Sequence, residues 1–196
     1  TLASVGVDRV VTIDIHAEQI QGFFDIPVDH LRAGRELVEH LRGLGIDDPL
    51  VVSPDAGGVD RASRFAMGLG GRMALIDRRR GSPSKVKSMH LVGDVVDKEC
   101  ILVDDMIDTG STLTEAADLL MTSGAKSVRA VVTHPVLSGS GVERLNRSKI
   151  SELIATDTVP LPVEKQIDKI TVVSVAARLA AVIDNVHHGR SVKELG

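Results

Sequence analysis

Short apolar runs that alternate with helix-like segments limit this sequence to a narrow choice of folds. Most of the runs are continuously apolar instead of alternating with polar residues, which is typical of strands covered on both faces. Between them, apolar residues recur at helical spacing in residues 113–121, just before Gly124, and again in residues 175–186. This order predicts an α/β fold with a mostly parallel sheet and helices on both of its faces. The predicted strands are residues 10–13, 50–52, 73–76, 101–103, 128–132, 153–155 and 170–173.

The composition excludes several classes of protein. Of the 196 residues, 43% are apolar and the net charge is −4, so we expect a soluble globular protein of one full domain, or one domain plus part of another. No apolar run approaches the roughly 18 residues of a membrane span, so no membrane contact is expected. The chain has no Trp or Tyr and only three Phe residues, which disfavours nucleic-acid binding. A single cysteine, Cys100, excludes an intrachain disulfide and a CxxC zinc site, and favours a cytoplasmic location.

Polar side chains follow several of the predicted strands directly. Ligands of open parallel sheets bind at the carboxyl ends of the strands, so these positions are candidates for chemistry. They are residues 14–16, 53–55, 77–80, 104–105 and 133–135.

The strongest of these signals is the segment of residues 101–112. A buried strand delivers Asp104 and Asp105, and a short loop containing Gly110 then opens a helix. Helix N-termini present unpaired N–H groups and a partial positive charge, so residues 108–112 can cradle a phosphate. Carboxylates this close would repel a phosphate unless they face sugar hydroxyls or a divalent cation. The alternative is a well-capped helix, because Thr112 and Glu115 fit a capping box.

At these residues the sequence resembles a known family. Residues 103–112 are similar to the phosphoribosyl pyrophosphate signature of type I phosphoribosyltransferases and of ribose-phosphate diphosphokinases. The resemblance implies a parallel sheet of phosphoribosyltransferase type. It also implies that two acids hold the ribose, Asp104 and Asp105, and that the following loop holds the 5-phosphate, through Asp108, Thr109, Gly110, Ser111 and Thr112.

A second segment distinguishes between these relatives. Residues 14–29 resemble the diagnostic segment of ribose-phosphate diphosphokinases, which type I phosphoribosyltransferases lack. On its own, a histidine at a strand end is more often structural than a ligand, but carboxylates surround this one. The resemblance implies that His16 approaches the ATP phosphates and their Mg²⁺, and that a second segment, residues 52–58, adds Asp55. The other acids it associates with the metal are Asp14, Asp25 and Asp29.

A basic stretch follows the third predicted strand. Arg78, Arg79, Arg80, Lys85 and Lys87 lie together with no acid among them. Three interpretations remain open: a solvated charge run, a nucleic-acid contact that the composition disfavours, or a lid whose cations stabilise phosphoryl transfer. The resemblance favours the lid and implies catalytic roles for Arg78 and Arg80, with Arg80 also contacting the ribose phosphate. The family normally has Lys where this chain has Arg78, and Arg differs from Lys in reach and geometry.

Together these features predict a domain organisation and an activity. The chain starts with Thr1, and its first six residues read as the end of a helix, so we expect part of a longer protein. The resemblance implies that residues 1–32 end a first phosphoribosyltransferase-like domain and that residues 33–196 form a second. It further implies diphosphate transfer from MgATP to ribose 5-phosphate, giving phosphoribosyl pyrophosphate and AMP, in a homo-oligomer that is a hexamer in the family. The alternative is a catalytically silent regulatory subunit or inactive fragment that still binds ribose 5-phosphate.

Overall fold

A computed structural model describes residues 2–79 and 88–195. Its strands are β1 (Val10–Ile13), β2 (Val28–Leu31), β3 (Leu50–Ser53), β4 (Arg72–Arg79), β5 (Ser88–Val92), β6 (Glu99–Ile107), β7 (Ser127–Pro135), β8 (Glu152–Thr156) and β9 (Ile170–Val173). Its α-helices are α1 (Gly34–Gly43), α2 (Val59–Leu69), α3 (Ser111–Thr122), α4 (Gly141–Arg147) and α5 (Ala176–His187). Short 3-10 turns lie at Ala3–Val5, Glu18–Phe23, Ala56–Gly58, Val163–Lys165 and Lys193–Leu195.

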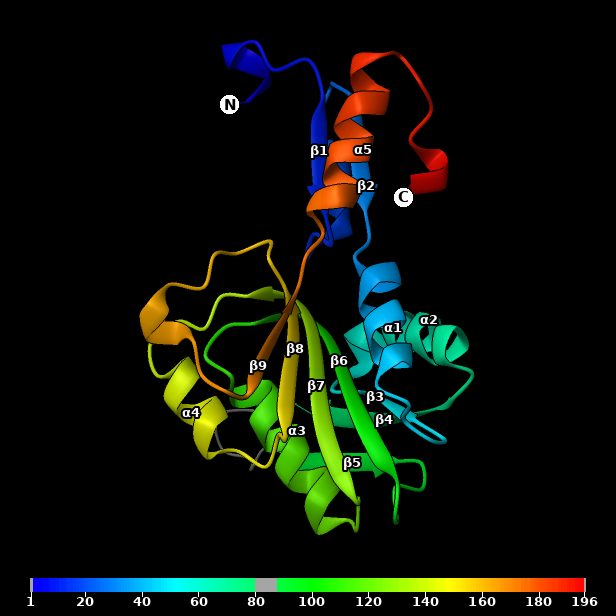
Figure 1. The fold of residues 1–196 in the computed structure, drawn as a ribbon, viewed down its shortest axis with the longest axis vertical. Helices are drawn as coiled ribbons and strands as arrows, with labels where there is room; N and C mark the ends of the chain where they lie inside the picture. The colour runs from blue at the N-terminus through cyan, green and yellow to red at the C-terminus, as the bar shows by residue number, and fades with distance from the viewer. Residues whose placement is uncertain (1, 80–87, 196) are drawn as a thin grey trace.

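A seven-stranded sheet forms the body of the protein (Figure 1). Its strand order is β5-β4-β3-β6-β7-β8-β9, and every neighbouring pair is parallel except β4 and β5. The prediction of a mostly parallel sheet is therefore confirmed, and each predicted apolar run lies in a strand. The carboxyl ends of the parallel strands share one edge, which brings the polar residues that follow them together.

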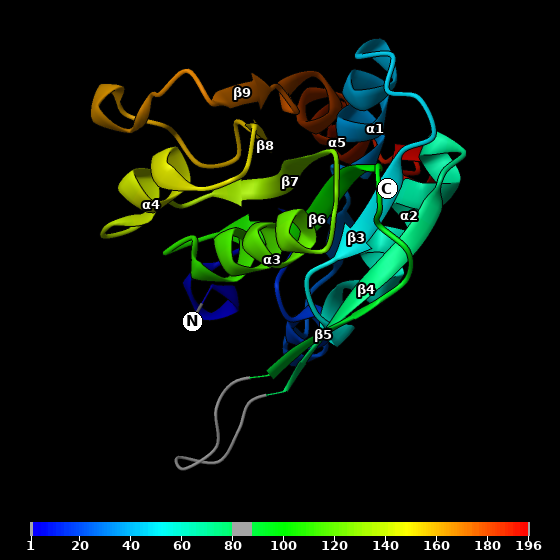
Figure 2. The ribbon, with the colours of Figure 1, turned by 90° about the horizontal axis from the view of Figure 1, so that it is seen from below.

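Helices cover both faces of this sheet, as predicted (Figure 2). Leu37 of α1 and Phe65 of α2 pack with Ile101 on one face, whereas Leu113 of α3 packs with Leu102 on the other. Successive side chains of a strand point to opposite faces. The central strand β6 therefore contributes to two separate cores, which explains why its sequence is continuously apolar.

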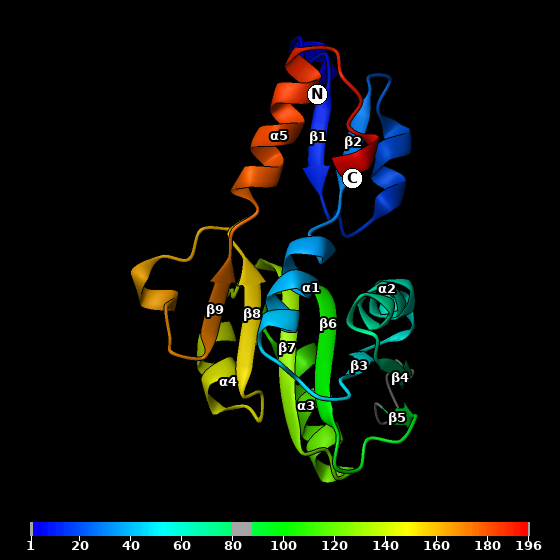
Figure 3. The same ribbon diagram turned by 45° about the vertical axis from the view of Figure 1, so that its right-hand side comes forward.

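The first predicted strand lies outside the large sheet. β1 pairs in parallel with β2, with Val10 opposite Val28, to form a separate two-stranded sheet. Helix α5 runs beside this small sheet in both side views of the molecule (Figures 1 and 3). Neither β2 nor β5 was predicted, because Asp29 and His30 leave β2 without an apolar run and because β5 is an edge strand that contains Ser88 and His90. Among the described residues, no helix is long and apolar enough to cross a membrane.

Candidate active site

A pair of adjacent carboxylates near the end of β6 forms the centre of the candidate site. The backbone N–H of Asp105 donates to Asp104 Oδ1 over 2.9 Å. His16, from the loop after β1, places its Nδ1 2.6 Å from Asp105 Oδ2. Arg61 of α2 lies close to both acids, with Nη1 3.6 Å from Asp104 Oδ1 and 3.9 Å from Asp105 Oδ1. Segments far apart in the sequence thus hold the acidic pair in place.

The pKa values of the two carboxyl groups are shifted in opposite directions. Burial raises the pKa of Asp104 to about 7, and the hydrogen bond and negative charge of Asp105 add to this shift. Burial acts in the same direction on Asp105, but hydrogen bonds from Asp104 and His16, together with the charge of Arg61, lower the pKa of Asp105 below its usual value. Near neutral pH the pair therefore offers one group that can donate a proton in a hydrogen bond and one that only accepts.

The raised pKa of Asp104 makes stability depend on pH. The unfolded chain loses this proton near pH 4, whereas the folded protein keeps it to about pH 7. The stabilisation is therefore complete below pH 4 and is lost as the pH rises through 7. In Asp104→Asn this loss is absent, so between pH 5 and pH 8 the parent should lose on the order of 2 kcal/mol more unfolding free energy than the variant. Urea unfolding at both pH values measures this difference.

The exposed acid of α3, Asp118, provides the control for this experiment. Asp118→Asn should keep the parent's pH dependence, because its side chain lies at the surface. If the unfolding free energy of the parent and of Asp104→Asn changed equally between pH 5 and pH 8, Asp104 would not hold its proton to neutral pH.

The loop between β6 and α3 has a backbone shape that depends on glycine. Gly110 precedes the first residue of α3 with a φ of 78°, in the left-handed region, and it is buried. Its carbonyl accepts from Thr114 Oγ1 over 2.9 Å, and Ser138 Oγ donates to Asp108 Oδ1 across the loop. The helix starts at Ser111, so the capping box predicted from Thr112 and Glu115 is wrong: no side chain caps this helix end. The N–H groups of the first turn are left available to an anion.

One cavity of about 280 Å³ gathers most of the predicted site. Asp55 joins it from the end of β3, where its Oδ1 accepts from the Gly58 N–H over 3.1 Å. The predicted residues that line the cavity are His16, Asp55, Asp104, Asp105, Asp108, Thr109, Gly110, Ser111 and Thr112.

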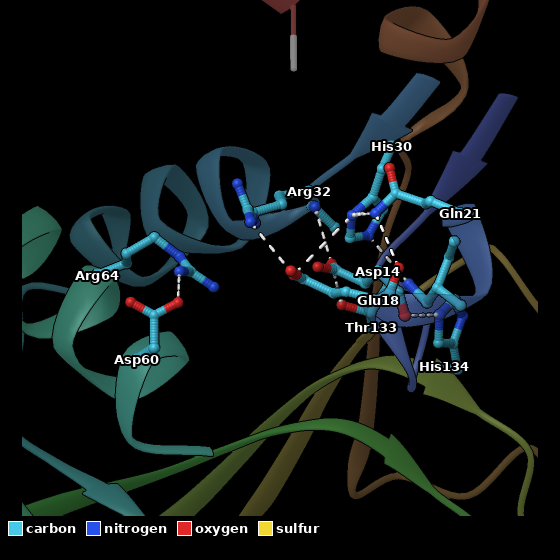
Figure 4. A network of polar contacts seen from close by, with 11 residues as sticks. Asp14, Glu18, Gln21, His30, Arg32, Asp60, Arg64, Thr133 and His134 are labelled. Atoms are coloured by element: carbon cyan, nitrogen blue, oxygen red, sulfur yellow. Dashed lines mark hydrogen bonds and ion pairs between the residues drawn. The ribbon is translucent and has the colours of Figure 1, made fainter. Parts of the chain in front are cut away.

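The structure does not bring the other three predicted metal acids into this cavity. Asp14 is buried, and its Oδ2 accepts from the Ala33 N–H over 2.9 Å and from Thr133 Oγ1 over 2.6 Å (Figure 4). Asp29 pairs with Arg9 over 2.5 Å. Asp25 is exposed in the bend after Glu18–Phe23. Asp14 instead ties the small sheet to β7 and the start of α1, and so supports His16 two residues later.

The donor set in the cavity suits a hard cation. Within residues 2–79 and 88–195, no group of three or more His, Cys, Asp or Glu side chains converges to hold a metal. Mg²⁺ needs no such cage, because it is usually held by one or two carboxylates together with substrate phosphates and water. Asp55 and the acidic pair supply oxygen donors of this kind.

Arg78 lies in β4, and its guanidinium pairs with Glu115 Oε2 in the second turn of α3. This contact places a cation near the loop between β6 and α3 and gives Glu115 a role other than capping. Arg80, Lys85 and Lys87 lie outside the described residues.

Comparison with known proteins places this site in a family. The family model described as the phosphoribosyl synthetase-associated domain matches residues 76–195, which include β6, the loop and α3. The chain belongs to the phosphoribosyl synthetase-associated domain family. The ribose-phosphate pyrophosphokinase of Bacillus caldolyticus is 48% identical over 194 residues, which are 99% of this chain but 62% of that protein. The chain thus spans less than two thirds of this relative's length.

Solved structures agree with this family assignment. The crystal structure of phosphoribosylpyrophosphate synthetase from Mycobacterium smegmatis superposes with a TM-score of 0.89 at 42% identity, covering 96% of this chain and 61% of that one. Adenine phosphoribosyltransferase (APRTase) from Giardia lamblia superposes at a TM-score of 0.52 and 19% identity, covering 63% of this chain and 75% of that one. The latter shows that the phosphoribosyl synthetase-associated domain shares its fold with phosphoribosyltransferases, and confirms the predicted fold class.

Three residues at or beside the site were not predicted to belong to it. Arg61 carried no local signal beyond its place in the helix after residues 55–58. Glu115 was interpreted as part of a cap, and Ser138 sits in a loop that reaches Asp108 only once the sheet has formed.

Proposed function

We propose that the chain carries the ribose 5-phosphate site of a ribose-phosphate diphosphokinase. The observation that supports this most strongly is a single cavity that combines the paired acids with a helix N-terminus and its hydroxyl-bearing loop. A ligand with vicinal hydroxyls and a phosphate at opposite ends satisfies both halves of this cavity.

Each half has a defined role in this proposal. Asp105 accepts from one ribose hydroxyl, and Asp104 donates to or accepts from the other according to its protonation. The backbone N–H groups of residues 109–112 and the hydroxyls of Thr109, Ser111 and Thr112 bind the 5-phosphate. Asp108, fixed by Ser138, shapes the loop.

The proposed reaction transfers diphosphate from ATP to the anomeric hydroxyl of ribose 5-phosphate. The hydroxyl oxygen forms a bond to the β-phosphorus while the bond from that phosphorus to the oxygen of AMP breaks, and the hydroxyl proton is released to solvent. The products are phosphoribosyl pyrophosphate and AMP. Arg78, and in the sequence Arg80, would stabilise the charge that develops on the transferred group. Asp55 and His16 would hold Mg²⁺ with the polyphosphate, and this ion would neutralise negative charge there.

We also propose the domain organisation and assembly that the family implies. Residues 1–32, with their separate sheet, would belong to a first phosphoribosyltransferase-like unit, and residues 33–196 to a second. A homo-oligomer, a hexamer in the family, would complete the ATP pocket.

Calorimetric titration with ribose 5-phosphate and, separately, with MgATP tests this function, followed by an AMP-release assay with both. Saturable binding of ribose 5-phosphate together with AMP formation supports the full reaction. No binding of ribose 5-phosphate contradicts the assignment of residues 104–112.

One observation favours a second candidate, a catalytically silent subunit that binds ribose 5-phosphate. Arg78 stands where the family normally has Lys, and it is engaged by Glu115. Binding of ribose 5-phosphate without AMP release in the same assay supports this alternative.

Replacing Arg78 by alanine distinguishes a role in transfer from a role in binding. Under the proposed reaction, Arg78→Ala should lower the rate of AMP release about 100-fold, because a donor to the developing charge is lost. The affinity for ribose 5-phosphate should change less than about 3-fold, because the cradle is intact. Arg72→Ala, on the same strand but paired with Asp48 over 2.8 Å, is the matched control. Equal rates of AMP release in the two variants would show that Arg78 has no part in the transfer.

A further inference from the structure

A second cavity, of about 320 Å³, adjoins the acidic pair. Asp104 lines both this cavity and the candidate active site. One wall is apolar, formed by Val38 of α1 and Phe65 of α2. The rest carries arginines from separate parts of the chain: Arg32 before α1, Arg35 in α1, Arg61 and Arg64 in α2, and Arg178 in α5.

Two of these arginines have unsatisfied donors. The Nε atoms of Arg32 and Arg61 are buried and make no hydrogen bond within the described part of the chain. A buried donor without an acceptor destabilises the folded protein. A small rotation of either guanidinium toward an oxygen acceptor in the cavity would satisfy these donors, which favours a ligand over an inert void.

The partners of the other arginines leave room for such a ligand. Arg64 pairs with Asp60 within α2, and Arg32 pairs with Glu18 over 3.2 Å (Figure 4). Both acids are largely exposed, and surface pairs of this kind contribute little, so a bound anion can compete for the guanidinium groups. Arg178 is different: it is buried, and it donates to Glu36 over 2.9 Å and to the Arg32 carbonyl. It therefore holds Arg32 in position.

The two acids that line the cavity are already engaged. Asp14 accepts from Ala33 and Thr133, and Asp104 accepts from the Asp105 N–H. Their hydrogen bonds reduce the repulsion that an incoming anion meets, while the arginines outnumber them.

We propose that this cavity is a second binding site, separate from the phosphate loop, for a small organic phosphate ester. The phosphate would accept from the guanidinium groups of Arg32, Arg61 and Arg64, with Arg32 and Arg61 turning their Nε–H groups toward it. The organic group would pack on Val38 and Phe65, because an apolar wall stabilises carbon and not a free ion.

The Nε–H resonances of the arginines in ¹H–¹⁵N spectra test this proposal at the atoms concerned. Phenyl phosphate and inorganic phosphate are titrated into the full 196-residue chain at constant ionic strength. We expect the Arg32 and Arg61 signals to shift saturably, with phenyl phosphate binding at least 3-fold more tightly than inorganic phosphate. The same titration on Gly110→Val, which disrupts the phosphate loop, should give the same shifts, so the result does not depend on the proposed function.

Alanine variants of single arginines test which side chains bind the phosphate. Arg32→Ala and Arg64→Ala should each weaken phenyl phosphate binding at least 5-fold, whereas Arg72→Ala, outside the cavity, should leave it unchanged. Shifts that do not saturate, or that appear equally on Arg72, would overturn the proposal, because they report screening of surface charge. Equal affinity for the two probes would overturn the ester assignment.

Discussion

Replacing Gly110 by valine is expected to reduce the affinity for ribose 5-phosphate at least 100-fold. The left-handed φ of 78° is costly for a β-branched residue. A Cβ at this position would make ordinary contacts with the Gly141 carbonyl oxygen at 3.5 Å and with Ile107 Cδ1 at 3.8 Å, so the backbone strain is what displaces the loop. The phosphate would lose several charge-assisted hydrogen bonds of roughly 1.5–3 kcal/mol each. Calorimetric titration measures the loss.

Gly189 offers the matched control for this prediction. It also has a left-handed φ, of 65°, but no atom lies within 4 Å of the position that a Cβ would take, and it follows α5, away from the cavity. Gly189→Val should bind ribose 5-phosphate like the parent. Unchanged affinity in Gly110→Val would mean that the loop does not hold the phosphate.

Asp14→Ala is expected to lower the free energy of unfolding by about 3 kcal/mol. The substitution removes the acceptor of the Ala33 N–H and of Thr133 Oγ1, and each buried donor left without a partner costs about 1–3 kcal/mol. Asp14 also has a left-handed φ of 42°, which aspartate tolerates better than alanine. Urea unfolding measures the change.

Asp25→Ala serves as the comparison for Asp14→Ala, because the same resemblance assigned both residues to a metal. Its side chain is exposed, so the substitution should change stability by less than about 0.5 kcal/mol. A similar small loss in Asp14→Ala would contradict the structural role given to Asp14.

Apolar patterning predicted the large sheet well because both of its faces are covered. In β6 and β7, packing on both faces requires apolar residues at successive positions, so each strand contains a continuous apolar run. β2 and β5 contain no such run: β2 belongs to a small sheet with partly exposed residues, and β5 is an edge strand. Periodicity also gave no indication that β1 pairs apart from the other strands, because pairing depends on tertiary contacts.

The candidate site was predictable where its residues are adjacent in sequence. Residues 104–112 run from the end of β6 through one loop into the first turn of α3, so their order in the sequence was enough to group them in one candidate site. Arg61 could not be found in this way, since only the packing of α2 against β6 brings it to the acidic pair. Asp14 and His16 lie two residues apart but face different partners, which a pattern of residue types does not distinguish.

Calorimetric titration of the chain with ribose 5-phosphate tests the central claim most directly. The account predicts saturable binding to the parent that is lost in Gly110→Val and retained in Gly189→Val. Absence of binding to the parent, or binding that survives in Gly110→Val, would contradict the assignment of residues 104–112 as the ribose 5-phosphate site.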